Sequence, residues 1–325
     1  MIVMRGNATL FILFQMIWTV GFSQSLQLPE NWGEHFRRAN LDVRWEATNV
    51  LPHTVWIYRV LPKAFQPEGI SNLVLQCGFT ESNIIKSNAD FVVYAIPGKF
   101  GITHPSKQLQ ISRGCIFFIN QTHYGPTNLA TDVPEMNQML RVTTNFLTTI
   151  GLNIAKIEKK SDGTPKFEFI EPFKEYCLPN GTFVTNVEFR EVGFGRSVDG
   201  AKVLGAAGYG DIYFGEHGKP IHIDVSWQYF ERFKSCPAAT PEIIIKWIRE
   251  GKAMQGGIPM NQPPINWATV KSLTIKEANL CYYAGDRLAP SGWLTPLVSF
   301  WTTVDTGQGN VDVEIDCPII DETRL

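Results

Sequence analysis

The sequence predicts an α+β fold in which antiparallel β-sheets are covered on one face by short helices, arranged as two subdomains. Three segments, 67–78, 134–151 and 241–251, space their apolar residues with helical periodicity, begin near a proline and end at a glycine. Each is followed by stretches in which apolar and polar residues alternate, which is typical of half-buried strands. Because helices and strands do not alternate regularly, the pattern favours antiparallel sheets over a doubly wound parallel sheet.

The clearest single element is a β-hairpin whose turn is the Gly-bounded tetrapeptide 215–218. Apolar residues alternate with polar ones on both sides of that turn. The apolar positions are Ile212 and Phe214 on the first arm, and Ile221, Ile223, Val225 and Trp227 on the second. The stretch 187–233 is therefore expected to form a central sheet onto which the helix at 241–251 folds.

The N-terminus, residues 1–23, is typical of a signal peptide. Arg5 is its sole charge, 10–20 is an apolar run, and small residues precede a cleavage site before Gln24. The apolar run is shorter than the roughly 20 residues that cross a membrane. The alternative is an uncleaved N-terminal anchor, which is the one membrane contact that the sequence offers. The sequence therefore predicts a secreted or periplasmic protein.

Two α+β domains are expected after the signal peptide, an N-terminal one at 24–170 and a C-terminal one at 182–325, on either side of the polar, Pro-containing patch 171–181. The first would contain an extended arm at 24–50, a strand or extended segment at 51–65, the helix at 67–78, strands at 89–96 and 115–120, the helix at 134–151, and strands at 152–158 and 166–170. The second would contain the sheet at 182–233, the helix at 241–251, and strands at 270–283, 294–303 and 311–315.

The composition fits an exported globular protein with a packed core. The formal net charge of −2 gives no reason to expect a nucleic-acid partner, which would need a basic stripe. Six cysteines follow the signal peptide: Cys77, Cys115, Cys177, Cys236, Cys281 and Cys317. In an oxidising compartment they could form up to three disulfides, with fifteen pairings open; alternatively, several are buried small apolar residues. Asn120 and Asn180 both head acceptor sequences for N-glycosylation.

The segments that resemble catalytic or cofactor-binding motifs are better explained by their structural roles. The Gly-rich segment 193–200 lacks the third glycine of a dinucleotide fingerprint and has no helix pattern behind it, so its glycines are interpreted as turns and bulges. His222 and Asp224, two apart on one strand, share a face beside His217, and a solvated strand face explains them best. The HExxH, GxSxG and CxxC motifs are absent, so the sequence favours a non-catalytic protein without a metal or cofactor.

Aromatic residues offer a binding alternative. Trp227, Tyr229 and Phe230, together with Trp293, Phe300 and Trp301, could line a carbohydrate or peptide groove, although core packing is the simpler interpretation. Exposed sheet edges are a more general route to a partner, because an edge strand can accept a peptide strand. The face expected to bind a partner comprises Arg196, His222, Asp224 and Trp227.

The second half of the chain carries a family resemblance in its turn glycines and alternating strands. The segments concerned are 195–203, 210–212, 218–221, 280–283 and 294–300. Over residues 186–316 this pattern resembles PepSY-type domains and YycI-like extracytoplasmic regulators. The resemblance implies PepSY-like subdomains and a non-catalytic role, because members of these groups generally bind or inhibit a partner at the cell envelope.

Three hypotheses for function remain open. The first is an exported, non-catalytic binding or regulatory protein of the cell envelope or extracellular space, with a protein or peptide partner. The second is a secreted hydrolase whose site is assembled from distant residues, with His222 and Asp224 as candidates. The third is a structural surface module. A cluster converging on His222 in the folded chain would favour the hydrolase.

Overall fold

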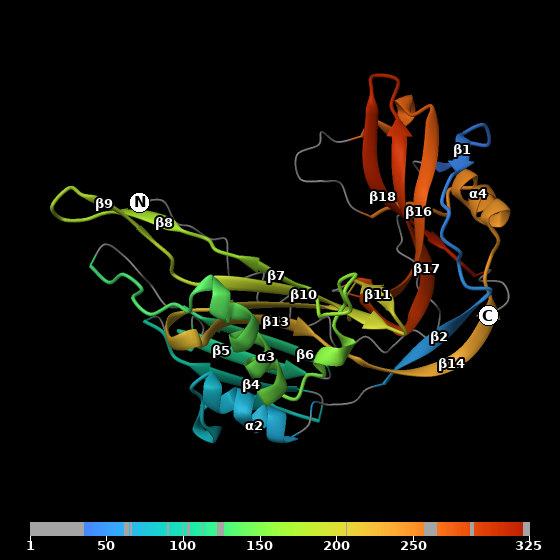
Figure 1. The fold of residues 1–325 in the computed structure, drawn as a ribbon. Coiled ribbons are helices and arrows are strands. Elements are labelled where there is room, and N and C mark those ends of the chain that lie inside the picture. Colours follow the sequence, from blue (N-terminus) through green and yellow to red (C-terminus); the bar gives the residue numbers. More distant parts are fainter. Residues whose placement is uncertain are drawn as a thin grey trace, which may run out of the picture. The chain divides into compact units, whose positions relative to one another are not determined.

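The computed structural model describes residues 36–61, 65, 67–89, 91–99, 101–102, 105–112, 114–121, 127–205, 207–256, 265–286 and 289–320. The predicted signal peptide, 1–23, lies outside these residues. The chain forms two compact units (Figure 1), each of which is described by itself. Unit 2 consists of Leu61–Val203 and Ala207–Tyr229, and unit 1 combines the two ends of the chain, up to Val60 and from Phe230, with 204–206. The predicted boundary at 171–181 falls inside unit 2.

The predicted α+β class is wrong, because the protein is mostly β. Strands make up 49% of it and helices 18%. Among the described residues, sixteen strands build mixed sheet, nine of them in unit 2 and seven in unit 1. Short helices on one face of separate antiparallel sheets, in two PepSY-like subdomains, are therefore not the architecture. Several strands had no sequence signal, because they are short and lack clear alternation.

Unit 2 is built on an antiparallel sheet in which β13 pairs with the much earlier strand β6. In spatial order its strands are β7 (Phe167–Ile170), β10 (Arg190–Val198), β12 (Tyr209–Phe214), β13 (Pro220–Ser226), β6 (Cys115–Asn120), β5 (Lys107–Ser112), β4 (Phe91–Ile96) and β3 (Ile84–Ser87), while β11 (Ala201–Leu204) pairs with the end of β10. The helices α2 (Pro67–Gln76) and α3 (Met139–Thr149) lie against this sheet (Figure 1). The predicted strand at 152–158 is wrong, since Ile154–Lys156 forms a 3-10 turn.

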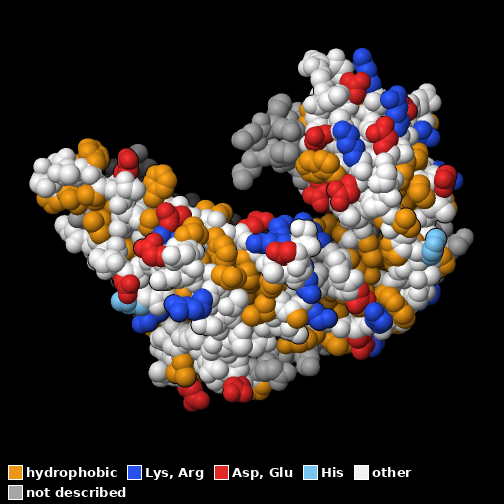
Figure 2. Space-filling model, viewed as in Figure 1, with side chains coloured by type: hydrophobic (Ala, Val, Ile, Leu, Met, Phe, Trp, Pro, Cys, Tyr) orange, Lys and Arg blue, Asp and Glu red, His pale blue; other side chains and the backbone are white. Residues whose placement is uncertain are grey.

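A separate hairpin extends from unit 2 (Figure 1). It consists of β8 (Lys174–Cys177) and β9 (Phe183–Asn186), which pair only with each other among the described strands. Hydrophobic side chains gather on it (Figure 2), and Phe173 and Phe183 are 67% and 71% exposed. It occupies the polar stretch that the sequence suggested as a linker.

All three predicted helices are present and end in the same way, although the second starts later than the predicted residue 134, with a 3-10 turn at Met136–Gln138 before α3. After α2, the amide of Phe79 donates to the carbonyl of Val74, and the amide of Gly78 donates to Leu75. Gly78 has φ +76°, a left-handed conformation that glycine adopts without steric cost. The same bond pattern follows α3 at Gly151 and follows α4 (Pro241–Arg249) at Gly251. The glycines of the sequence pattern are therefore true helix caps.

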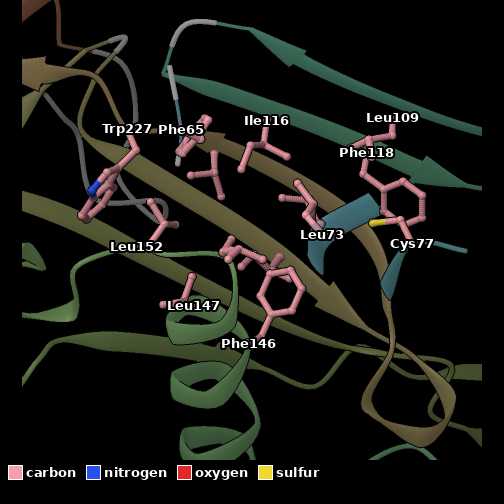
Figure 3. Packing of buried hydrophobic residues seen from close by; sticks show 14 of the residues in the cluster. Phe65, Leu73, Cys77, Leu109, Ile116, Phe118, Phe146, Leu147, Leu152 and Trp227 are labelled. Atoms are coloured by element: carbon pink, nitrogen blue, oxygen red, sulfur yellow. The ribbon is translucent and has the colours of Figure 1, made fainter. Parts of the chain in front are cut away.

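The core of unit 2 lies between the two helices and the sheet. Leu73 of α2, Cys77 just after that helix, and Phe146 and Leu147 of α3 pack with buried strand residues such as Phe118 (Figure 3). On β10, β12 and β13, every second side chain enters this core. Members from those strands are Val192, Phe194, Ile212, Phe214, Ile223 and Val225.

The predicted hairpin around 215–218 is confirmed as β12 and β13. Its register places Ile212 opposite Ile223 and Tyr213 opposite His222. The neighbouring turn between β10 and β11 has only two residues, Asp199 (φ 50°) and Gly200 (φ 84°). Two consecutive positive φ angles are typical of the type I′ turn that two-residue hairpins favour. The glycine at 200 is thus turn chemistry, as expected, but Gly193 and Gly195 lie within β10.

Unit 1 holds the other seven strands. They are β1 (Asp42–Trp45), β2 (Thr54–Leu61), β14 (Tyr229–Pro237), β15 (Met254–Gln255), β16 (Ser272–Asp286), β17 (Ala289–Asp305) and β18 (Asn310–Pro318). The long strands β16, β17 and β18 form an antiparallel meander, whereas β1 runs parallel to β16. Ile244, Trp247 and Ile248 of α4 enter the core of this unit. The prediction that this helix folds onto the sheet at 187–233 is therefore wrong, because most of that stretch belongs to unit 2. Across the described residues, the helices are too short or too polar to cross a membrane.

Candidate binding face

The sheet of unit 2 has a second face, opposite the one that α2 and α3 cover, and we call it the open face. Because side chains alternate along a strand, the neighbours of the core residues Val192, Ile212 and Ile223 point to this side. The open face carries Glu191, Gly193 and Gly195 of β10, Tyr209, Asp211 and Tyr213 of β12, His222, Asp224 and Ser226 of β13, and Cys115, Phe117 and Ile119 of β6. Apart from buried Ser226, these residues are half-buried.

Aromatic rings form a row across the open face. The rings of Phe189 and Tyr213 stack in parallel, with centroids 4.9 Å apart. The ring of Tyr213 is 4.7 Å from that of His222, and Phe117 meets His222 edge-on at 5.8 Å. The cross-strand register places Tyr213 directly opposite His222, and such pairs stabilise a sheet. The row is therefore a fixed platform that spans three neighbouring strands, β12, β13 and β6, together with the residue that precedes β10.

Carboxylates lie beside this row. Asp211 and Asp224 are directly opposite each other on β12 and β13, which places their Cβ atoms about 5 Å apart. The hydroxyl of Tyr209 donates to Oδ1 of Asp224 over 3.1 Å. Glu191 lies on the same face of the adjacent strand, opposite Tyr213. Like charges are thus collected at one place in the middle of the sheet.

The pKa values on the open face reflect this crowding. Burial raises the pKa of Asp211, and the charge of Asp224 raises it further, against lowering contributions from His222 and Tyr213. Burial and then the charge of Asp211 raise the pKa of Glu191. Burial and the carboxylates of Asp211 and Glu191 raise the pKa of Tyr213 to about 12. The negative charges repel each other in a partly desolvated place, so a cation would stabilise them.

The four residues that the sequence suggested as a binding face lie on two different faces of the sheet. His222 and Asp224 lie together on the open face, as expected from their spacing. Arg196 and Trp227 are buried on the other side, with exposed fractions of 6% and 3%. The guanidinium of Arg196 lies 4.8 Å from the ring centre of Trp227 and donates to the carbonyl of Gln228. Burial lowers the pKa of Arg196 to about 10, because desolvation disfavours its charge, and the contact with the Trp227 ring offsets part of that cost.

The sequence interpretation missed the partners of His222 and Asp224. Asp211 and Tyr213 belong to the opposite hairpin arm, and Glu191 belongs to the next strand. The length of the turn does not give this register, because a β-bulge between Tyr213 and Phe214 shifts the pairing along the hairpin. No three His, Cys, Asp or Glu side chains among the described residues are placed to hold a metal ion.

The other aromatic candidates do not assemble into one groove. Trp227 belongs to the core of unit 2, and Phe300 belongs to that of unit 1. In unit 1, Trp293 packs on Phe233 with ring centroids 4.7 Å apart, and Trp301 is 42% exposed. Tyr229 and Phe230 are half-buried. Core and sheet-face packing account for most of this set.

All six cysteines are free thiols in the structure. Cys77, Cys236, Cys281 and Cys317 are buried, Cys115 is half-buried and Cys177 is exposed. Burial raises the pKa of the Cys77 and Cys317 thiols, which makes them poor nucleophiles. Four of the six cysteines are therefore buried, as the alternative to disulfides expected. The disulfides stay a prediction.

The two glycosylation sequences differ in setting. Asn180 is exposed in the turn between β8 and β9, where its Oδ1 accepts from the amide of Thr182. Asn120 is half-buried and ends strand β6, opposite Lys107 of β5. Of the two, Asn180 is the one that a modifying enzyme could reach on an exposed turn.

Comparison with known proteins supplies no family. No family model and no curated protein match the chain. Among solved structures that match is an uncharacterised protein from Eubacterium rectale, 10% identical, covering 85% of this chain and 86% of that one with a TM-score of 0.41. A likeness at that level carries no argument about function. The resemblance to PepSY-type and YycI-like domains accordingly stays a prediction.

Proposed function

We propose that the protein is an exported, non-catalytic binding protein whose protein or peptide partner docks on the open face of unit 2. The observation that carries this proposal is the aromatic row of Phe189, Tyr213, His222 and Phe117 beside the carboxylates of Asp211 and Asp224. Tyrosine and phenylalanine are enriched in protein interfaces because they bury a large area at a small cost in side-chain entropy. Export rests on the N-terminal sequence, which is typical of a signal peptide.

The face is a better docking surface than the sheet edge. Edge strand β3 has four residues, all exposed, and it includes Lys86. Short edge strands that carry lysine are typical of edges protected against pairing with another chain. The open face, by contrast, spans several strands and combines apolar rings with polar groups. It therefore supports docking across its surface more strongly than strand addition at β3.

Site-specific photo-crosslinking tests the proposal. Benzoylphenylalanine replaces Tyr213 on the open face or, as a matched control, Leu140, an exposed residue of α3 on the other side of the sheet. We expect one protein to be captured reproducibly, in the cells that make this chain, from position 213 and not from 140. Capture should fall when Phe117→Ala shortens the aromatic row. Equal capture at both positions, or none at 213, would contradict docking on the open face.

A second candidate, a secreted hydrolase, is favoured by one observation. Asp211, with a raised pKa, stands directly opposite Asp224, and in glycoside hydrolysis a carboxylic acid with a raised pKa acts as general acid beside a second carboxylate. In this case the purified chain would release nitrophenol from a panel of 4-nitrophenyl glycosides. Asp211→Asn would abolish that release, whereas Glu175→Gln on the β8–β9 hairpin would not. Absence of release across the panel would favour the binding role.

A further inference from the structure

We propose that the partner inserts a basic side chain, of lysine or arginine, into the open face above Gly193. This inference rests on the proposed docking of a partner on that face and identifies the chemistry that is recognised there. Gly193 has no side chain and leaves open space on this face of the sheet. If a Cβ were placed on Gly193, the nearest atom would be Glu168 Cβ, 4.0 Å away. A ligand group can therefore occupy the place that other residues of the strand fill.

Acidic residues border Gly193 on three sides. We call the open position above Gly193 the cation seat. Glu168 of β7 is directly opposite Gly193 on one side, and Asp211 of β12 is directly opposite on the other. Glu191 precedes Gly193 by two residues and shares its face. Asp224 lies one strand further, opposite Asp211. The cation seat is thus an open position enclosed by carboxylates that come from three strands.

The basic groups around the cation seat do not balance its charge. Lys166 pairs with two of the carboxylates, with Nζ 3.4 Å from Glu158 and 3.6 Å from Glu168. His222 faces Asp211 from β13 and lowers its pKa. The carboxylates of this region are Glu158, Glu168, Glu191, Asp211 and Asp224, and the remaining titratable groups are Tyr209 and Tyr213. Among the described residues, the acidic groups outnumber the basic ones, so the complementary partner is basic.

One further observation points to a ligand with hydrogen-bond donors. Oδ1 of Asp211 is shielded from solvent and accepts no hydrogen bond from the described residues. A buried oxygen without a donor is costly, and a lysine or arginine of the partner supplies charged donors. Arginine suits this position, because its guanidinium carries several charged donors in a fixed geometry.

Isothermal titration calorimetry of the full chain with defined peptides tests the inference. The probes are acetylated, amidated hexapeptides of alternating arginine and serine, and the same peptide with citrulline in place of arginine, both in EDTA at low salt. Citrulline keeps the shape of arginine and removes its charge. We expect the arginine peptide to bind at least about tenfold more tightly than the citrulline peptide. Equal affinities, or no binding of either peptide, would overturn the cation seat.

Variants separate a specific seat from general attraction between charges. Gly193→Val fills the cation seat while every charge stays in place, so the affinity for the arginine peptide should fall about tenfold or more. Asp211→Asn with Glu191→Gln should weaken binding by a similar factor. The matched control, Glu68→Gln with Glu175→Gln, removes the same charge from exposed positions elsewhere in unit 2 and should leave binding nearly unchanged. If the control weakens binding as much as Gly193→Val, the attraction is non-specific and the inference is wrong.

Each variant must remain folded for this comparison. Thermal unfolding is therefore measured on the same samples, and we expect the acid-to-amide variants to melt no lower than the wild type, because they relieve repulsion between carboxylates.

The experiments distinguish failure of the cation-seat inference from failure of the docking proposal. If position 213 still captures a partner while arginine and citrulline peptides bind equally, docking stands and the recognition of a basic group is wrong. If position 213 captures nothing, the docking proposal itself has failed.

Discussion

The two faces of the unit 2 sheet are made by alternate residues of the same strands, yet they treat charge in opposite ways. On the inner face, buried Arg196 lies over the ring of Trp227, and buried Arg190 donates to Pro134 and pairs with Glu171. On the open face, Asp211 and Asp224 stand opposite each other with like charge. Arg190 thus meets a carboxylate and Arg196 meets an aromatic ring and a carbonyl, whereas Asp211 stands opposite a second carboxylate.

The difference between the two faces indicates that the residues of the open face are not chosen for stability alone. A sheet that only had to fold could carry neutral side chains at 211 and 224. Instead, like charges are held together beside Gly193, where a strand position is left without a side chain. Places that break local rules for stability are typically functional sites. The comparison of the two faces is therefore the main support for a binding role, and mutations on neighbouring residues can test it.

The largest effect is expected from the adjacent pair Phe214 and Tyr213 on β12. Phe214 is fully buried in the core, whereas Tyr213 lies half-buried on the open face. Phe214→Ala should lower the free energy of unfolding by about 3–5 kcal/mol, because it removes buried area and leaves a cavity. Tyr213→Ala should cost less than half as much, and urea unfolding measures both. Equal losses would mean that the open face is itself part of the core.

Glycines give a second matched pair, with effects of opposite sign. A Cβ at Gly210, on the inner face, would overlap the ring of Phe194, so Gly210→Ala should destabilise unit 2 by about 1–3 kcal/mol. At Gly193, on the open face, there is room for a methyl group. Gly193→Ala should therefore raise stability by about 0.5–1 kcal/mol, because glycine is unfavourable inside a strand. A loss at Gly193 as large as that at Gly210 would show that the cation seat is not open.

Much of this contrast could be predicted from the sequence. Alternation placed His222 and Asp224 on one face, and placed Trp227 in phase with Ile223 and Val225, which are buried. Arg196 is also in phase with Val192 and Phe194 on β10, but its charge argued for the surface. It is buried because Trp227 and the carbonyl of Gln228 compensate it. Such compensation depends on tertiary contacts that no local pattern contains.

The fold class could not be predicted for a related reason. The helices carry strong local signals, such as the proline and glycine around α4, and they were found at nearly the right residues. Strands β3 and β8 have four residues each, with little alternation, and local sequence did not reveal them. Strand β1 pairs with β16 across more than 200 residues, parallel to it. The sequence patterns therefore predicted too large a helical share. They missed short strands that are stabilised by pairing with residues far away in the sequence.

The smallest expected effect concerns the carboxylates, and its pH dependence has a definite sign. Asp211→Asn should raise the free energy of unfolding at pH 7 by a few tenths to about 1 kcal/mol, because opposed like charges destabilise a sheet. Raised pKa values of Asp211 and Glu191 mean that the folded state binds protons more tightly than the unfolded state. The wild type thus regains stability as pH falls through these raised values, so the advantage of Asp211→Asn should shrink towards pH ~4.

Glu188 provides the control of opposite sign for that measurement. Burial raises its pKa, but hydrogen bonds from Lys174 and Tyr176 outweigh burial and hold the pKa below its ordinary value. Its carboxylate therefore stabilises the fold at neutral pH, and this contribution is lost as pH falls through the lowered value. Glu188→Gln should destabilise at pH 7, with a penalty that fades in acid. If Asp211→Asn behaved like Glu188→Gln, the charge of Asp211 would be compensated within the chain, and no basic side chain from a partner would be needed to balance it.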